Sequence, residues 1–137
     1  HRLPGAAPNV ETALAPGDLI AGFRILAGPW TRRSLYLKIR DRQSYEFALA
    51  SAAIALDMDG PKVREARIAL GGVATVPWRS REAEDALAGK DLTEATARAA
   101  ARAAFATARP RLHNGFKVAL GQSTLVRALM QAKDMEG

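Results

Sequence analysis

The 137-residue chain is 48% hydrophobic and 25% charged, a composition typical of one soluble globular domain. It contains no cysteine, which excludes a disulfide framework, an iron–sulfur cluster and a thiolate zinc site within the chain. The net charge of +6 raises the question of nucleic acid, but cations and acids alternate in segments such as KVREAR, as on a solvated surface. No uncharged apolar run reaches the length of a membrane span, so neither membrane insertion nor a nucleic-acid partner is expected.

The beginning of the chain is typical of an irregular arm followed by a short strand. Residues 1–17 are rich in proline and glycine, and the sequence APGD is a turn signal. Apolar residues alternate loosely from Leu19 to Leu26, which predicts a strand. Ala27-Gly28-Pro29 would break it, so we expect a boundary between two parts of the chain there.

The middle of the chain predicts antiparallel strands. Residues 34–39 alternate between apolar and polar, residues 47–57 are continuously apolar, and residues 63–75 alternate again. Asp59-Gly60 is a hairpin signal between the last two segments. The adjacent Gly71-Gly72 indicates a bulge or a close backbone approach.

Two helices should follow the strands. Ser80 can cap the first, which carries acids in its early turns, and Gly89 should end it. Asp91 followed by Glu94 resembles a capping box for the second helix, predicted over residues 93–108.

A third helix completes the expected fold. The segment RLHNGFK over residues 111–117 is predicted to be a loop, and residues 121–133 an amphipathic helix. Strands followed by helices predict an α+β domain: a small antiparallel sheet with about three helices packed on one face.

The residues that catalysis needs are sparse. The chain has two histidines, His1 and His113, and neither has a serine or cysteine partner in a recognisable setting. No cluster of His, Cys and carboxylates has metal-ligand spacing, and no glycine segment matches a phosphate-binding motif. No catalytic residue is therefore predicted.

One basic segment, YLKIRDRQSYEF, has regular spacing. Lys38, Arg40 and Arg42 occupy every second position, and Tyr45 and Phe47 follow them. A strand with that period would project all three cations from one face. The segment could be a strand edge kept soluble by cations, or it could contact an electron-rich cofactor such as a flavin, whose reduced ring a lysine ammonium stabilises.

Three blocks carry a family resemblance. SLYLKIRDRQSYEFALASAAIAL, then RIALGGVATVPWRSREAEDAL, then NGFKVAL followed by LVRAL, resemble the C-terminal domain of the FAD-binding (medium) subunit of molybdenum hydroxylases. That family includes xanthine dehydrogenases, carbon monoxide dehydrogenase and aldehyde oxidoreductases. The resemblance covers about residues 18–130. It implies that residues 1–28 are the tail of an upstream FAD-binding domain plus a linker, and that residues 29–137 form the C-terminal α+β domain.

The resemblance also implies a function within a complex. Substrate is hydroxylated at a molybdenum cofactor in a large subunit, and [2Fe–2S] clusters in a small subunit pass the electrons to FAD, which delivers them to an external acceptor. FAD would be bound mainly by the upstream domain, so we expect this chain alone to be inactive. In the chain itself, Lys38 would contact the flavin by its charge, and Ile20 or its neighbour Leu19 by packing and backbone.

The expected compartment is the cytoplasm, although the family also has periplasmic members. The alternative function is a stand-alone basic module that binds nucleic acid or an acidic protein, with a salt-dependent affinity and no flavin.

Overall fold

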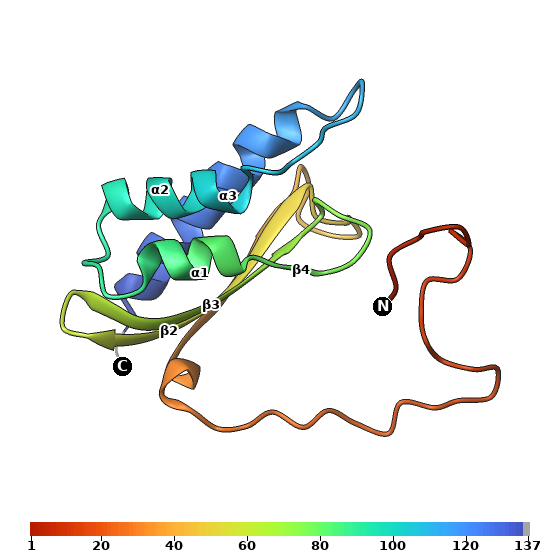
Figure 1. Cartoon of the computed structure of the whole chain (residues 1–137), viewed down its shortest axis with the longest axis horizontal. Coiled ribbons are helices and arrows are strands. Elements are labelled where there is room, and N and C mark those ends of the chain that lie inside the picture. Colours follow the sequence, from red (N-terminus) through yellow and green to blue (C-terminus); the bar gives the residue numbers. More distant parts are fainter. Residues whose placement is uncertain (136–137) are drawn as a thin grey trace.

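The computed structural model, which describes residues 1–135, contains one antiparallel sheet and three helices (Figure 1). The strands lie in chain order across the sheet: β1 (Arg33–Ile39), β2 (Ala50–Asp59), β3 (Lys62–Gly71) and β4 (Trp78–Arg79). The other elements are η1 (Pro29–Thr31), α1 (Arg81–Leu87), α2 (Glu94–Ala104) and α3 (Phe116–Lys133). The α+β expectation is confirmed, and the expected C-terminal domain, residues 29–137, is described as far as residue 135.

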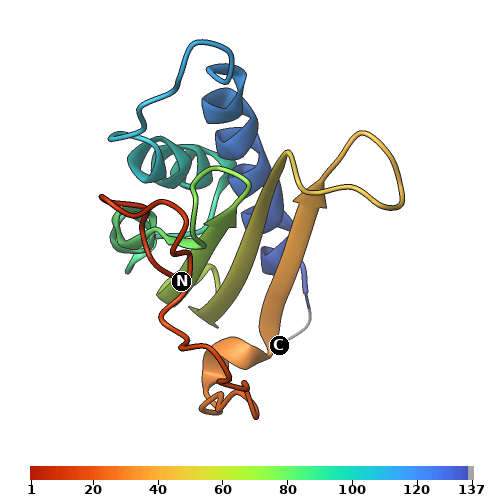
Figure 2. The ribbon, with the colours of Figure 1, turned by 90° about the vertical axis from the view of Figure 1, so that its right-hand side faces the viewer.

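The three helices cover one face of the sheet in two tiers (Figures 1 and 2). Helix α3 packs on β1 and β2, and α1 packs on β3. Helix α2 rests on α1 and α3. None of the helices within residues 1–135 is long and apolar enough to cross a membrane.

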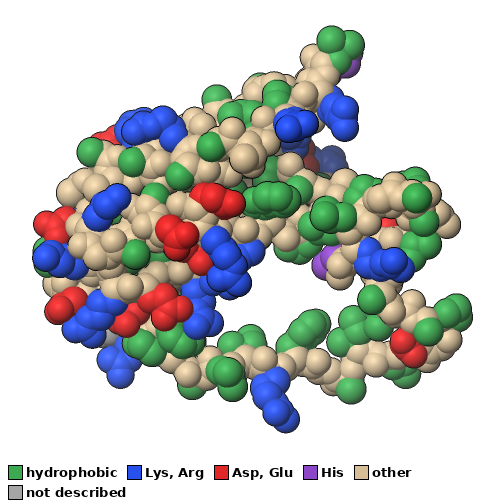
Figure 3. Space-filling view, in the orientation of Figure 1, with side chains coloured by type: hydrophobic (Ala, Val, Ile, Leu, Met, Phe, Trp, Pro, Cys, Tyr) green, Lys and Arg blue, Asp and Glu red, His purple; other side chains and the backbone are tan. Residues whose placement is uncertain are grey.

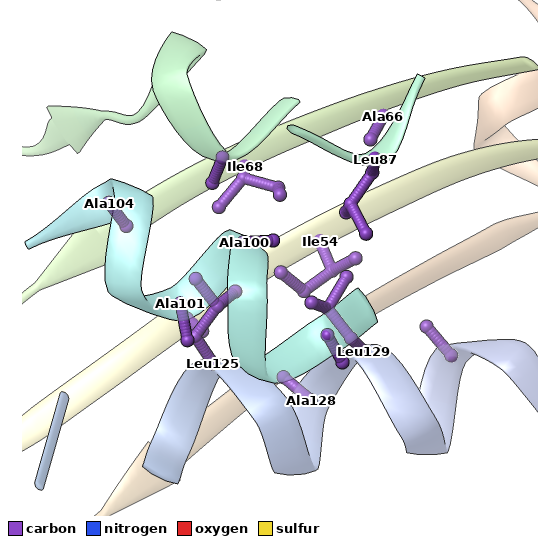
Figure 4. Close-up of a cluster of buried hydrophobic side chains, with 14 of the residues drawn as sticks. Ile54, Ala66, Ile68, Leu87, Ala100, Ala101, Ala104, Leu125, Ala128 and Leu129 are labelled. Carbon is purple, nitrogen blue, oxygen red and sulfur yellow. The ribbon is translucent and has the colours of Figure 1, made fainter. Parts of the chain in front are cut away.

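The core lies between the sheet and the helices. Ile54, Ile68, Leu125 and Leu129 are at most 2% exposed and come from two strands and from α3 (Figure 4). The alanines of α2 that face inward are also buried. Because alanine side chains are short, α2 can approach the other two helices closely.

The predicted hairpin is confirmed, with shifted ends. Gly60 has φ +55° in the turn between β2 and β3, a conformation that glycine adopts without strain. Strand β3 ends at Gly71, because Gly72 has φ +71° and any Cβ there would lie 2.8 Å from the carbonyl oxygen of Ala48. The glycine pair therefore marks the close backbone approach that its sequence predicted. The two-residue strand β4, which pairs with β3, was not predicted.

The helix boundaries differ from their predictions in three places. Helix α2 ends at Ala104, four residues before its predicted end. Helix α2 is capped by Thr93 and Thr96, whose side chains and backbone groups form the capping box, instead of Asp91 and Glu94. Helix α3 begins at Phe116, five residues before its predicted start. Gly121 lies inside α3 because the ring of Phe105 occupies the space where a Cβ would be, so the glycine serves helix packing. The caps at Ser80 and Gly89 follow their predictions.

The predicted strand over residues 19–26 is absent. Residues 1–28 form an arm without helix or strand, and its apolar side chains stand away from the body of the molecule (Figure 3). A lone strand leaves its backbone groups to water, and this domain offers the segment no partner strand. Alternation of apolar residues was therefore not enough to predict a strand in this segment.

A buried carboxylate fastens α1 to the sheet. Glu84, whose side chain is 10% exposed, accepts a 2.8 Å hydrogen bond from the backbone N–H of Ile68 in β3 and also binds the guanidinium of Arg79 in β4. The hydrogen bond to Glu84 raises the pKa of Arg79, against the opposing effect of burial. One side chain thus joins α1, β3 and β4.

We expect Glu84→Ala to lower the free energy of unfolding by about 1–3 kcal/mol, because it removes the acceptor of a buried N–H group. Urea unfolding followed by circular dichroism measures the effect. The matched control is Glu94→Ala, since Glu94 forms an exposed ion pair with Arg98. Equal losses in the two variants would contradict the special role of Glu84.

Candidate functional site

One face of the sheet is left uncovered by the helices. Leu35 and Leu37 of β1 pack against the core, while Tyr36 between them faces away and is 62% exposed. The register places Tyr36 opposite Ala53 of β2, and Ala53 opposite Ala69 of β3. An aromatic ring and two small side chains therefore form a row across the outer face.

This row of side chains forms part of the lining of a shallow hollow of about 420 Å³. Tyr36, Ala53, Ala69 and two arginines are among the residues that line it. One of them, Arg67, has its guanidinium carbon 3.5 Å from the ring centroid of Trp30 in η1, a cation–π contact. Arg67 is also paired with Glu65 at 2.8 Å, and the second arginine, Arg79, is paired with Glu84. The outer face thus offers a partly apolar floor with two ion pairs beside it.

Lys38 lies at the end of the same face, as the second-to-last residue of β1, before a long loop. Its ammonium group donates a hydrogen bond to the backbone carbonyl of Glu46. An ammonium has three donors, so two remain without a protein acceptor among residues 1–135. Lys38 is therefore placed to contact an additional acceptor at the edge of the sheet.

The loop of residues 40–49 is held by its own hydrogen bonds. The carboxylate of Glu46 accepts 2.8 Å bonds from the backbone N–H groups of Asp41 and Arg42. The guanidinium of Arg42 donates to the carbonyl oxygen of Tyr45, which has φ +52°. A non-glycine residue in this region costs about 1 kcal/mol, and the surrounding bonds offset that cost.

The three cations of the basic segment do not share a strand face. Strand β1 ends at Ile39, so Lys38 alone lies on it, whereas Arg40 and Arg42 are exposed in the loop. The bend over residues 41–45 breaks the period of two that the segment suggested. Tyr45 and Phe47 project into solvent, 98% and 95% exposed.

Lys117 of α3 fixes the base of this loop. Its ammonium group donates to the carbonyl of Leu49 at 2.8 Å and to that of Gly72 at 2.9 Å. Leu49 in turn donates from its N–H to Ile39 at 2.9 Å. Lys117 is not recognisable as part of this site from the sequence, because its acceptors lie 68 and 45 residues away.

The other two predicted site residues lie elsewhere. Leu19 and Ile20 are on the arm, 92% and 61% exposed, and both ribbon views place this part of the arm away from the loop of residues 40–49. The structure therefore does not bring them to Lys38. Within residues 1–135, no group of three or more His, Cys, Asp or Glu could hold a metal ion.

The sequence profile of the CO dehydrogenase flavoprotein C-terminal domain matches residues 35–132. The chain belongs to this family. The resemblance stated from the residues is thereby confirmed.

Among curated relatives, the aldehyde oxidoreductase FAD-binding subunit PaoB of Escherichia coli is 43% identical over 130 residues, which is 95% of this chain and 37% of that protein. The carbon monoxide dehydrogenase medium chain of Afipia carboxidovorans is 37% identical over 81 residues, 59% of this chain and 28% of the relative. The chain thus spans about a third of the length of these relatives.

Solved structures agree with the fold. The quinoline 2-oxidoreductase of Pseudomonas putida 86 superposes with a TM-score of 0.69 and 30% identity, covering 74% of this chain and 36% of that one. The carbon monoxide dehydrogenase of Hydrogenophaga pseudoflava gives a TM-score of 0.66 and 34% identity, covering 72% and 36%. The fold of this chain is therefore shared with the matched parts of these two solved structures.

Proposed function

We propose that this chain is the C-terminal part of the FAD subunit of a molybdenum hydroxylase. The observation that carries the proposal is the 43% identity, along 95% of the chain, to a protein named as an FAD-binding subunit. An upstream domain would hold most of the FAD, and residues 1–28 would be its tail and the linker. The alternation of Leu19 to Leu26 would then be satisfied by a partner strand in that domain.

The residues of the uncovered face fit a flavin. Lys38 keeps free donors at the edge of the face, and Tyr36 with its two neighbouring alanines offers a surface on which a planar ring can pack. When bound, FAD would supply the redox chemistry: it would take up electrons from the donor and pass them to an external acceptor. The chain itself would contribute in two ways. The positive charge of Lys38 would stabilise negative charge on the reduced ring, and the hydrogen bonds of Glu46 would hold the adjoining loop in its conformation.

Two partner subunits follow from the same proposal. A large subunit would carry the molybdenum cofactor, and a small subunit would carry the [2Fe–2S] clusters that supply electrons to FAD. The chain itself has no cysteine with which to hold such a cluster. Its proposed part in catalysis is therefore limited to the flavin.

A visible absorption spectrum tests the proposal. The protein from the full natural reading frame should show flavin bands after purification, whereas the 137-residue chain alone should show none. A colourless full-length protein that also fails to bind added FAD would overturn the proposed function. Flavin bands that persist in the isolated chain would contradict the assignment of most FAD contacts to the upstream domain.

A further inference from the structure

The positive charge of the chain is concentrated in its last two helices and the loop that joins them. The segment from the start of α2 to the end of α3, residues 94–133, contains seven lysines and arginines and one acid, Glu94, which pairs with Arg98. The rest of the chain has thirteen cations and thirteen acids, so its net charge is zero, against +6 for this segment. Surfaces with both signs interspersed are the ordinary solvated case, and this segment departs from it.

The joining loop, residues 105–115, presents two of these cations together with apolar side chains. It projects beyond the helices at the upper right of Figure 1. Arg109 and Arg111 are exposed on it, and Leu112 is 88% exposed between them and α3. Phe116, the first residue of α3, is 56% exposed.

The tip of this loop is ordered by local bonds. The side-chain oxygen of Asn114 accepts from the backbone N–H of Arg111, whose carbonyl accepts from Asn114 at 3.3 Å. Lys117 also donates its backbone N–H to the carbonyl of Asn114 at 3.0 Å. A surface that is already ordered loses little conformational entropy when a partner binds.

A cavity of about 220 Å³ lies under the loop. Leu70, Trp78 and Phe105 are among the apolar residues that line it, and Arg109 and Lys117 contribute positive charge. Its volume suits one or two apolar side chains. An apolar pocket with arginine and aromatic residues around it is the usual composition of an interface centre.

We propose that the loop of residues 105–115 and the adjoining cavity dock the acidic face of a partner subunit, which inserts an apolar side chain into the cavity. Charge complementarity argues for an acidic partner, because Arg109 and Arg111 form no ion pair within residues 1–135. An acidic protein fits better than nucleic acid, since a phosphate backbone leaves the cavity and Leu112 unused. The inference rests on the proposed function, which supplies the partner subunits.

Co-expression of the full-length subunit with its large and small subunits tests the inference. The variant Arg109→Glu/Arg111→Glu reverses two exposed loop charges. The control Arg81→Glu/Lys90→Glu reverses two exposed charges at either end of α1. Complex formation is measured by size-exclusion chromatography with light scattering at several salt concentrations, together with flavin content and binding of a single-stranded RNA oligonucleotide.

We expect the loop variant to bind its partner subunit about tenfold more weakly than the wild type or more, with normal flavin content, while the control assembles normally. Unchanged assembly of the loop variant would overturn the inference and leave the proposed function intact. Loss of RNA binding with unchanged assembly would also overturn it, in favour of a nucleic-acid surface. If the wild-type subunit assembles with no partner, the inference fails together with the complex that it presupposes.

Discussion

Replacing Leu129 by alanine should lower the free energy of unfolding by about 2–5 kcal/mol, the usual cost of a cavity at a fully buried leucine. Leu129 is 0% exposed and lies on α3 beside Ile54 of β2 (Figure 4). Since α3 is the helix that covers β1 and β2, the cavity would open where the sheet is fastened to its main helix. Equilibrium urea unfolding of the chain, followed by far-ultraviolet circular dichroism, measures the loss.

The matched control for this prediction is Leu112→Ala, which removes the same atoms from a side chain that is 88% exposed. Its free energy of unfolding should change by less than about 0.5 kcal/mol. Two variants of equal stability would mean that α3 does not close the core as described.

Lys38→Met in the full-length subunit should weaken FAD binding and lower the flavin reduction potential by about 30 mV or more, because it removes a cation that favours the reduced ring. Methionine keeps the length and apolar stem of lysine, so the sheet should remain intact. Flavin content after purification and spectroelectrochemical titration supply the two measurements. Lys38→Arg keeps the positive charge, so its flavin reduction potential should be closer to that of the wild type than to that of Lys38→Met.

The control for Lys38 is Lys90→Met, since the side chain of Lys90 lies in the turn after α1 and makes no hydrogen bond within the described part of the chain. A wild-type potential and flavin content in Lys38→Met would remove Lys38 from the site. A lowered flavin content with an unchanged potential would instead assign Lys38 to ordering the loop through Glu46.

Local patterns predicted most of the fold. The alternation of residues 34–39, the turn at Gly60 and the caps at Ser80 and Gly89 depend on neighbours in the sequence, and the structure contains all of them. The strand expected at residues 19–26 failed because a strand also needs a partner, which alternation does not supply.

The candidate site was less accessible to sequence reasoning for the same reason. Lys38 was singled out by its spacing, and the structure leaves it near an edge with free donors. Glu46 was not singled out, although its bonds to Asp41 and Arg42 span only a few residues. Lys117 and the contact between Trp30 and Arg67 join residues far apart in the chain, so no local pattern announces them.

The position of α3 has a consequence for biosynthesis. It is the last helix in chain order, yet it covers β1 and β2, the first two strands. During translation these strands emerge with their apolar faces exposed, and their final cover arrives only when α3 has left the ribosome. A ribosome that stalls within α3 would therefore display an open sheet to chaperones and proteases, whereas a nascent chain whose α3 has emerged as far as Lys133 can close its core.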